Sequence, residues 1–100
     1  MTRSLRPDGG YTEVPIEDWA AVVEHLRRFG APGEVTVEDG RVAVSVGSSR
    51  VAVTRDGRVE TGMPLHGFEK AGVETLGFDH DAGRLRVQGA DGLVYEFRRP

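Results

Sequence analysis

Seven valines that recur at alternate positions between residues 35 and 53 constrain the fold of this chain more than any other feature. They are Val35, Val37, Val42, Val44, Val46, Val51 and Val53. Successive side chains of a strand point to opposite faces of its sheet, so a period of two predicts strands with one apolar face. The region from Gly33 to Arg55 is therefore expected to form the first two hairpins of a β-meander that buries one face.

The turns between these strands can be assigned because facing residues must point to the same side of a sheet. Asp39 and Gly40 fit a two-residue type I′ turn, and residues 47–50 are expected to connect the next two strands. At Asp56 and Gly57, only a three-residue loop with the glycine in the left-handed conformation keeps the apolar side chains in phase. The predicted facing pairs are Val35–Val44, Val37–Val42, Glu38–Arg41, Val46–Val51, Val44–Val53 and Val53–Val59.

The same pattern returns near the C-terminus, where turns are expected at residues 80–83 and 90–92. The facing pairs predicted there are Leu76–Val87, Phe78–Leu85, Asp79–Arg84, Val87–Tyr95, Leu85–Phe97 and Arg86–Glu96. Between the two meanders, residues 62–72 break the alternation. We expect them to form an ordered crossover loop whose apolar side chains close one end of the core or face a partner.

Residues 15–29 are predicted to form a helix that covers the apolar face of the sheet. Pro15 suits the first helical position, because the amide hydrogen that proline lacks is not needed there. Glu17 and Asp18 in the first turn complement the helix dipole. Gly30 is typical of the residue that follows a helix. The apolar positions recur at helical spacing and are Ile16, Trp19, Ala20, Val23 and Leu26.

These elements predict an α+β fold with one N-terminal helix packed on a curled antiparallel sheet. The sheet is expected to have about seven meander-connected strands and the form of a roll or half-barrel, because one helix could not cover a flat sheet of that width. The alternative is two small sheets packed together with the helix at one end. A length of 100 residues favours a single domain. We assign residues 11–100 to it and residues 1–10 to a flexible N-terminal tail, with residues 11–14 as a candidate edge strand.

The composition excludes several classes of function. The chain has no cysteine, which rules out disulfides, thiolate metal sites and a cysteine nucleophile. The net charge is −3 and both signs are mixed, so no global field attracts nucleic acid or anionic lipid. No apolar run approaches the roughly 20 residues that span a bilayer. We therefore expect a cytoplasmic protein without membrane association.

Residue types that carry catalysis or bind metals are scarce. Asp79, His80 and Asp81 are consecutive, but neighbouring strand residues point to opposite faces, and the segment fits an ordinary turn. The chain lacks a G-x-S-x-G elbow and a P-loop. We expect no enzyme and no catalytic, cofactor or metal site. The remaining hypothesis of this kind is a small ligand site around His66, in the irregular segment 62–72.

Residues 78–97 resemble one copy of the YD (Rhs-type) repeat. The matching parts are the aromatic-Asp pair at Phe78 and Asp79, the run Gly83-Arg84-Leu85, and an ending with Tyr95 and Phe97. The family builds large shells from long arrays of such repeats, and this chain holds one copy. We interpret the resemblance as hairpin physics reached independently, and we draw no function from it.

The favoured functional hypothesis is a non-enzymatic module that binds a protein partner or forms a homodimer. One candidate surface is the segment 62–72, with Met63, Leu65, His66 and Phe68. The others are a free sheet edge and the outer sheet face, where side chains small enough for a second layer to approach are Ala43, Ser45, Ala52, Thr54 and Val94.

The alternative hypothesis is a weak nucleic-acid binder that contacts phosphates through arginines of the outer face. The candidate residues are Arg41, Arg58, Arg84, Arg86 and Arg98. Several carboxylates share that face in the predicted registers and oppose this hypothesis; they are Glu38, Glu60, Asp79 and Glu96.

Overall fold

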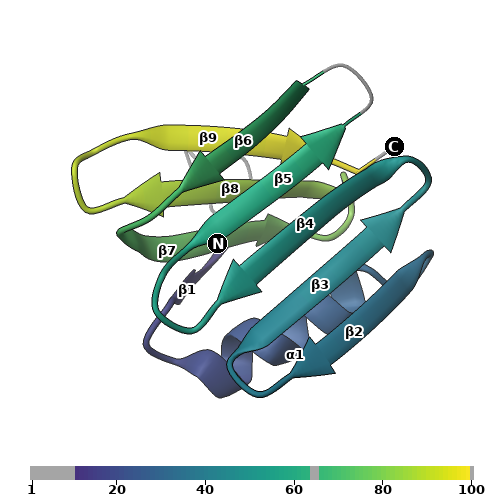
Figure 1. Cartoon of the computed structure of the whole chain (residues 1–100), viewed down its shortest axis with the longest axis horizontal. Coiled ribbons are helices and arrows are strands. Elements are labelled where there is room, and N and C mark those ends of the chain that lie inside the picture. Colours follow the sequence, from purple (N-terminus) through teal and green to yellow (C-terminus); the bar gives the residue numbers. More distant parts are fainter. Residues whose placement is uncertain (1–10, 64–65, 100) are drawn as a thin grey trace, which may run out of the picture.

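The computed structural model describes residues 11–63 and 66–99. Figure 1 shows how the helix and the strands follow one another in this part of the chain. Their bounds are β1 (Thr12–Pro15), α1 (Trp19–Phe29), β2 (Glu34–Glu38), β3 (Arg41–Val46), β4 (Ser49–Thr54), β5 (Val59–Met63), β6 (His66–Lys70), β7 (Val73–Asp79), β8 (Arg84–Gly89) and β9 (Val94–Arg98). In the described residues, no helix is long and apolar enough to cross a membrane. The tail assigned to residues 1–10 lies outside them.

The strands form two antiparallel sheets. Sheet A has the order β1-β7-β8-β9, and sheet B has the order β2-β3-β4-β5-β6. The α+β class is thus confirmed. The strands of the described chain number nine in two sheets, however, rather than about seven in one curled sheet, so the alternative of two packed sheets is the better description.

The segment 62–72 accounts for much of this difference, because it is not a crossover loop. Residues 66–70 form β6, which pairs with β5 and extends sheet B by one strand. Met63 and His66 are register partners across this hairpin, and Leu65 lies outside the described residues. The chain leaves sheet B after β6 and enters β7 of sheet A at Val73, where β7 pairs with the earlier strand β1. The two meanders therefore belong to different sheets.

Sheet B forms one layer, and sheet A and α1 together form the second (Figure 1). The helix packs against β2 and β3. Sheet A packs on the same face near the opposite edge of sheet B, at β5 and β6. There the hydroxyl of Tyr95 on β9 lies 3.4 Å from the Thr61 hydroxyl on β5, and the Tyr95 ring stacks on Phe68 of β6. The helix therefore covers the part of the valine-rich face that sheet A does not reach.

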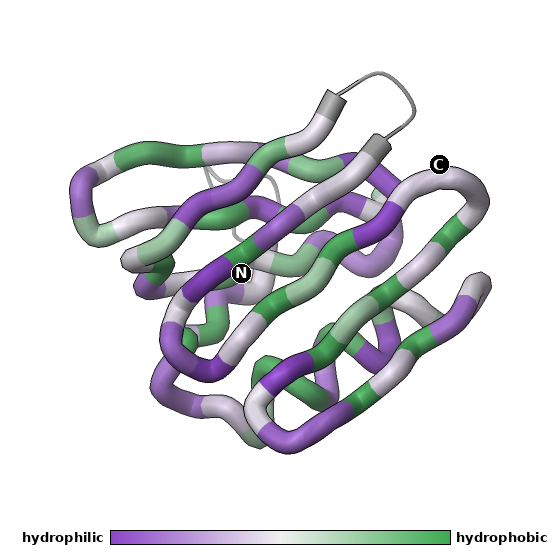
Figure 2. Tube along the Cα trace, in the orientation of Figure 1, coloured by the Kyte–Doolittle hydropathy of each residue, from purple (hydrophilic) through white to green (hydrophobic). Residues whose placement is uncertain are grey.

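The alternating pattern along the strands matches this two-layer arrangement. Figure 2 shows hydrophobic and hydrophilic segments alternating along the strands of sheet B. The inward valines of β3, β4 and β5 have at most 9% of their surface exposed; they are Val42, Val44, Val46, Val51, Val53 and Val59. Outward residues of the same strands, such as Arg41 and Glu60, keep contact with solvent. The period of two therefore identifies the buried face of β3, β4 and β5 correctly, whereas Val37 on β2 is 39% exposed.

Phe29 joins the helix to sheet A. Its side chain is fully buried, and its ring lies 6.2 Å from Phe78 of β7 and 6.3 Å from Phe97 of β9 between centroids. Val22 and Leu26 complete the buried stripe of α1. Gly30 follows the helix because a Cβ there would lie 2.6 Å from a Val44 methyl, and no larger residue fits between helix and sheet.

The helix begins at Trp19 and not at Pro15. Pro15 is the last residue of β1, and the amide of Ile16 still donates a hydrogen bond to the Glu74 carbonyl at 2.8 Å. Asp18 caps the helix, since its side chain accepts a hydrogen bond from the Ala21 amide. The predicted start was wrong because pairing with β7 competes with helix formation over these residues.

The facing pairs of the first and third turns and of the C-terminal meander are confirmed. Those pairs are Val35–Val44, Val37–Val42, Glu38–Arg41, Val53–Val59, Leu76–Val87, Phe78–Leu85, Asp79–Arg84, Val87–Tyr95, Leu85–Phe97 and Arg86–Glu96. The second turn differs from the prediction. It has only two residues between Val46 and Ser49, which places Val44 opposite Val51. The shift by two residues leaves all valines on the same face, so the apolar pattern alone could not detect it.

Replacement of Phe29 by alanine should strongly destabilise the fold. The variant Phe29→Ala leaves a cavity where the helix, β7 and β9 meet, and we expect a loss of about 3–5 kcal/mol in the free energy of unfolding. Glu24→Ala, on the exposed side of the same helix, should change it by no more than about 0.5 kcal/mol. Chemical denaturation measures both variants. A loss in Phe29→Ala as small as that in the control would contradict this packing.

Candidate functional site

The outer face of sheet A is covered by a side chain of the protein itself. Tyr11 precedes β1 and is 5% exposed, and its ring lies against Gly77. The guanidinium of Arg86 lies 4.2 Å from the ring centroid and that of Arg84 lies 5.4 Å from it. The Tyr11 hydroxyl donates a 2.6 Å hydrogen bond to Glu96. Burial, reinforced by this carboxylate, raises the pKa of the Tyr11 phenol.

Ion pairs occupy the arginines of the same face. Arg84 lies 2.8 Å from Asp79 and 3.6 Å from Glu96, and Arg86 lies 3.0 Å from Glu13. The hydrogen bond from Arg84, together with one from the amide of Ala82, lowers the pKa of Asp79. Cations and carboxylates thus neutralise one another across sheet A.

The outer face of sheet B is different, because it carries an open hollow of about 590 Å³. Small outward residues form its floor: Ala43 and Ala52 are register partners on β3 and β4, and Gly62 and Gly67 are register partners on β5 and β6. We call this feature the sheet B hollow. It exists because four neighbouring strands carry methyl groups or hydrogens where longer side chains would fill the space.

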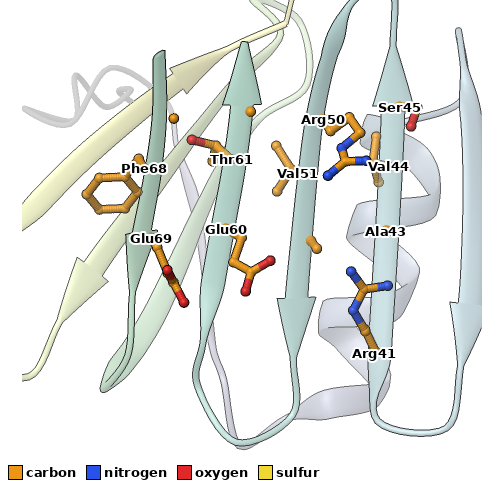
Figure 3. A pocket seen from close by; sticks show the side chains of 13 residues that line it. Arg41, Ala43, Val44, Ser45, Arg50, Val51, Glu60, Thr61, Phe68 and Glu69 are labelled. Carbon is orange, nitrogen blue, oxygen red and sulfur yellow. The ribbon is translucent and has the colours of Figure 1, made fainter.

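The charged walls of the hollow are divided by sign. Arg41 and Arg50 stand on β3 and β4, whereas Glu60 and Glu69 stand on β5 and β6 (Figure 3). Within the described residues, no carboxylate oxygen lies within 4 Å of the guanidinium of either arginine. This includes the carboxylate of Glu38, although Glu38 is the register partner of Arg41 on β2. One side of the sheet B hollow is therefore basic and the other side is acidic.

The two acidic residues lie next to each other. Glu60 and Glu69 are direct register partners on β5 and β6. Arg58, just before β5, forms an ion pair with Glu69. Like charges that face each other on neighbouring strands are destabilising. Arg58 offsets the charge of Glu69, whereas Glu60 lies opposite this pair with no cation within 4 Å in the described residues.

The five arginines proposed as nucleic-acid contacts are not brought together. Arg41 faces the sheet B hollow, while Arg84 and Arg86 lie on the outer face of sheet A, at the opposite side of the two-layer structure. Arg98 is the register partner of Arg84 at the end of β9. Arg58 is engaged with Glu69. The single basic face expected from one curled sheet is therefore split between two.

The predicted interaction residues of the segment 62–72 also separate. Phe68 is half-buried, and its ring stacks on Tyr95 at 3.8 Å between centroids, with the planes 2° apart. This ring therefore packs against sheet A, while Phe68 also borders the sheet B hollow. Met63 and His66 flank the hairpin, and Leu65 is outside the described residues.

A pair of histidines that sequence reasoning did not connect lies at the end of α1. His25 Nδ1 and His80 Nε2 are 3.0 Å apart, and both rings stack on Phe78. Burial lowers the pKa of His80, and the nearby positive charges of Arg28 and Arg99 add to the effect. No group of three His, Cys, Asp or Glu residues in the described chain could hold a metal ion.

Comparison with protein-family models, with curated proteins and with solved structures finds no match to this chain.

The histidine pair predicts a pH dependence of stability. Because the pKa of folded His80 lies below its ordinary value of 6.5, the unfolded chain binds this proton first as the pH falls. Well above pH 6.5, His80 is neutral in both states and does not affect the free energy of unfolding. As the pH drops through 6.5 toward the lowered pKa of folded His80, the free energy of unfolding decreases. His80→Gln should flatten this decrease in denaturation curves recorded from neutral to acidic pH. Equal slopes for the variant and the wild type would contradict it.

Proposed function

We propose that this protein is a non-enzymatic interaction module that binds a protein partner through the sheet B hollow. The observation that carries the proposal is the contrast between the two outer faces. Tyr11 and the ion pairs of Arg84 and Arg86 close the face of sheet A. The sheet B hollow has a floor of small residues, and its arginines lack carboxylates within the described part of the chain.

The chemistry of the hollow favours binding over catalysis. An active site brings a nucleophile or base within hydrogen-bond distance of a group that activates it. The charged side chains of the hollow are two arginines and two glutamates on separate strands. His80, whose pKa is shifted, interacts with α1 at another part of the fold. A wide and shallow surface with small central residues is better suited to another protein surface than to a small substrate.

Weak nucleic-acid binding is the less supported alternative. Only Arg41 of the five arginines faces the hollow, and Glu60 and Glu69 on the same surface would repel phosphates. A ligand site around His66 has less support as well, because Phe68 in the same hairpin stacks on Tyr95. A cytoplasmic location, expected because the sequence has no apolar run that could span a bilayer, is also part of this proposal.

A bulky residue in the floor of the hollow should abolish partner binding. In Ala52→Arg, a long side chain fills the hollow from the outer face of β4, so the fold is retained while a partner is kept away. Val94→Arg is the matched control, since Val94 is 56% exposed on sheet A. The 100-residue chain is immobilised and used to capture proteins from a cell extract to which a differently tagged second copy of the chain is added. Mass spectrometry measures the amount of each captured protein.

We expect at least one captured protein that binds the wild type and Val94→Arg but does not bind Ala52→Arg. If capture of every associated protein, the second copy included, is the same for Ala52→Arg and the wild type, the hollow is not the binding surface and the proposal fails.

A further inference from the structure

We infer that the partner is a second copy of this chain, docked hollow to hollow about a two-fold axis that runs parallel to the strands of sheet B. This inference rests on the proposed function, because both use the same surface. A two-fold dimer requires a patch that is complementary to itself. The division of charge across the sheet B hollow meets this requirement.

The strand registers fix where each charge lies along the sheet. Arg50 is level with Gly62 on β5, and Glu60 is level with Ala52 on β4 and with Glu69 on β6. The cations that line the hollow therefore stand on β3 and β4 and the anions on β5 and β6. Arg41 and Arg50 each lie two residues from the level of the two glutamates, in opposite directions along the strands.

A two-fold axis parallel to the strands, between β4 and β5, places the basic half of one copy over the acidic half of the other. β4 then faces β5 of the second copy, and β3 faces β6. Each arginine is offset from the carboxylate on the facing strand by two residues, or about 7 Å. An extended arginine side chain covers that distance. Gly62, level with Arg50, leaves room for its guanidinium.

The other face-to-face arrangement is disfavoured by charge. An axis in the interface but across the strands would keep β3 over β3 and β6 over β6. With the axis at the level of Glu60 and Glu69, each of these carboxylates would face its counterpart in the other copy. Arg50 of one copy would then lie over Thr54 of the other, beside Arg41. Like charges brought together at an interface cost several kcal/mol. Of these two orientations, the charges favour the axis parallel to the strands.

Docking would also relieve the like-charge neighbours within one copy. Glu60 faces Glu69 across the β5–β6 ladder, and Glu69 is already paired with Arg58. The second copy brings Arg50 to Glu60, the carboxylate without a cation in the described part of the chain. The small floor residues allow the two sheets to approach the usual spacing of about 10 Å. Charges on the rim and small residues in the centre therefore serve the same arrangement.

The size of the hollow sets the strength that we expect. Four neighbouring strands of five or six residues give a footprint of roughly 20 by 20 Å, on the order of 400 Å² per copy. Stable complexes bury about 800 Å² per partner, so this dimer should be weak and should exchange rapidly. It should also weaken with added salt, because ions screen charges at an exposed rim.

The test measures absolute mass by light scattering over a concentration series up to about millimolar, a range chosen for an interface of this small size. It uses two charge-reversal variants, R41E/R50E and E60R/E69R. The wild type should pass from monomer to dimer as the concentration rises. Each double variant alone should dimerise at least about tenfold more weakly, since its hollow carries one sign of charge. An equimolar mixture of the two should form a heterodimer, which also shows that both are folded.

A matched control distinguishes the effect of the charges in the sheet B hollow from the effect of a changed net charge. R27E/R98E changes the net charge as much as R41E/R50E but alters exposed positions on α1 and β9, outside the hollow, so the dimer should persist. A wild type that stays monomeric throughout the series, or a dimer that survives R41E/R50E, overturns the inference. If Ala52-dependent capture of another protein is then still observed, the proposed function stands and only the second copy as partner is wrong.

Discussion

The whole structure depends on the burial of one valine-rich face. Five neighbouring strands of sheet B present this face, and the four strands of sheet A do not cover it alone. Helix α1 covers β2 and β3, and Phe29 fills the junction where the helix meets Phe78 and Phe97. Because the helix and sheet A are both used on the inner side, the described chain offers no layer for the outer side of sheet B.

The local pattern was enough to predict most elements and most registers, but not β6 or the number of sheets. The period of two determines which side of a strand is buried, so pairs such as Val35–Val44 and Leu85–Phe97 followed from phase alone. A shift of the β3–β4 register by two residues at the second turn keeps every valine on the same face. The apolar pattern therefore could not distinguish the two registers. β6 was missed because its residues, HGFEK, show no clear alternation and become a strand only by pairing with β5.

The candidate site was predictable in part. The small outward residues Ala43 and Ala52 were recognised in the sequence, since they break a row of charged outward positions. The separation of basic from acidic strands could not be seen, because it depends on which strands share a sheet. Tyr11 and Glu96 are 85 positions apart in the sequence, and His25 and His80 are 55 positions apart. No local sequence pattern could therefore predict these contacts.

The most direct measurement of whether the sheet B hollow is kept for a partner is the access of solvent to its floor. An inert paramagnetic agent in solution broadens the NMR signals of methyl groups that it can reach, and the methyls of Ala43 and Ala52 report on the floor. Ala82, which is exposed in the turn between β7 and β8, serves as the reference. We predict that the two floor methyls are accessible in dilute protein and become shielded as its concentration rises, while Ala82 stays accessible. Floor methyls that are shielded even in dilute protein would contradict an open hollow. Floor methyls that match Ala82 at every concentration would contradict the second copy as the partner.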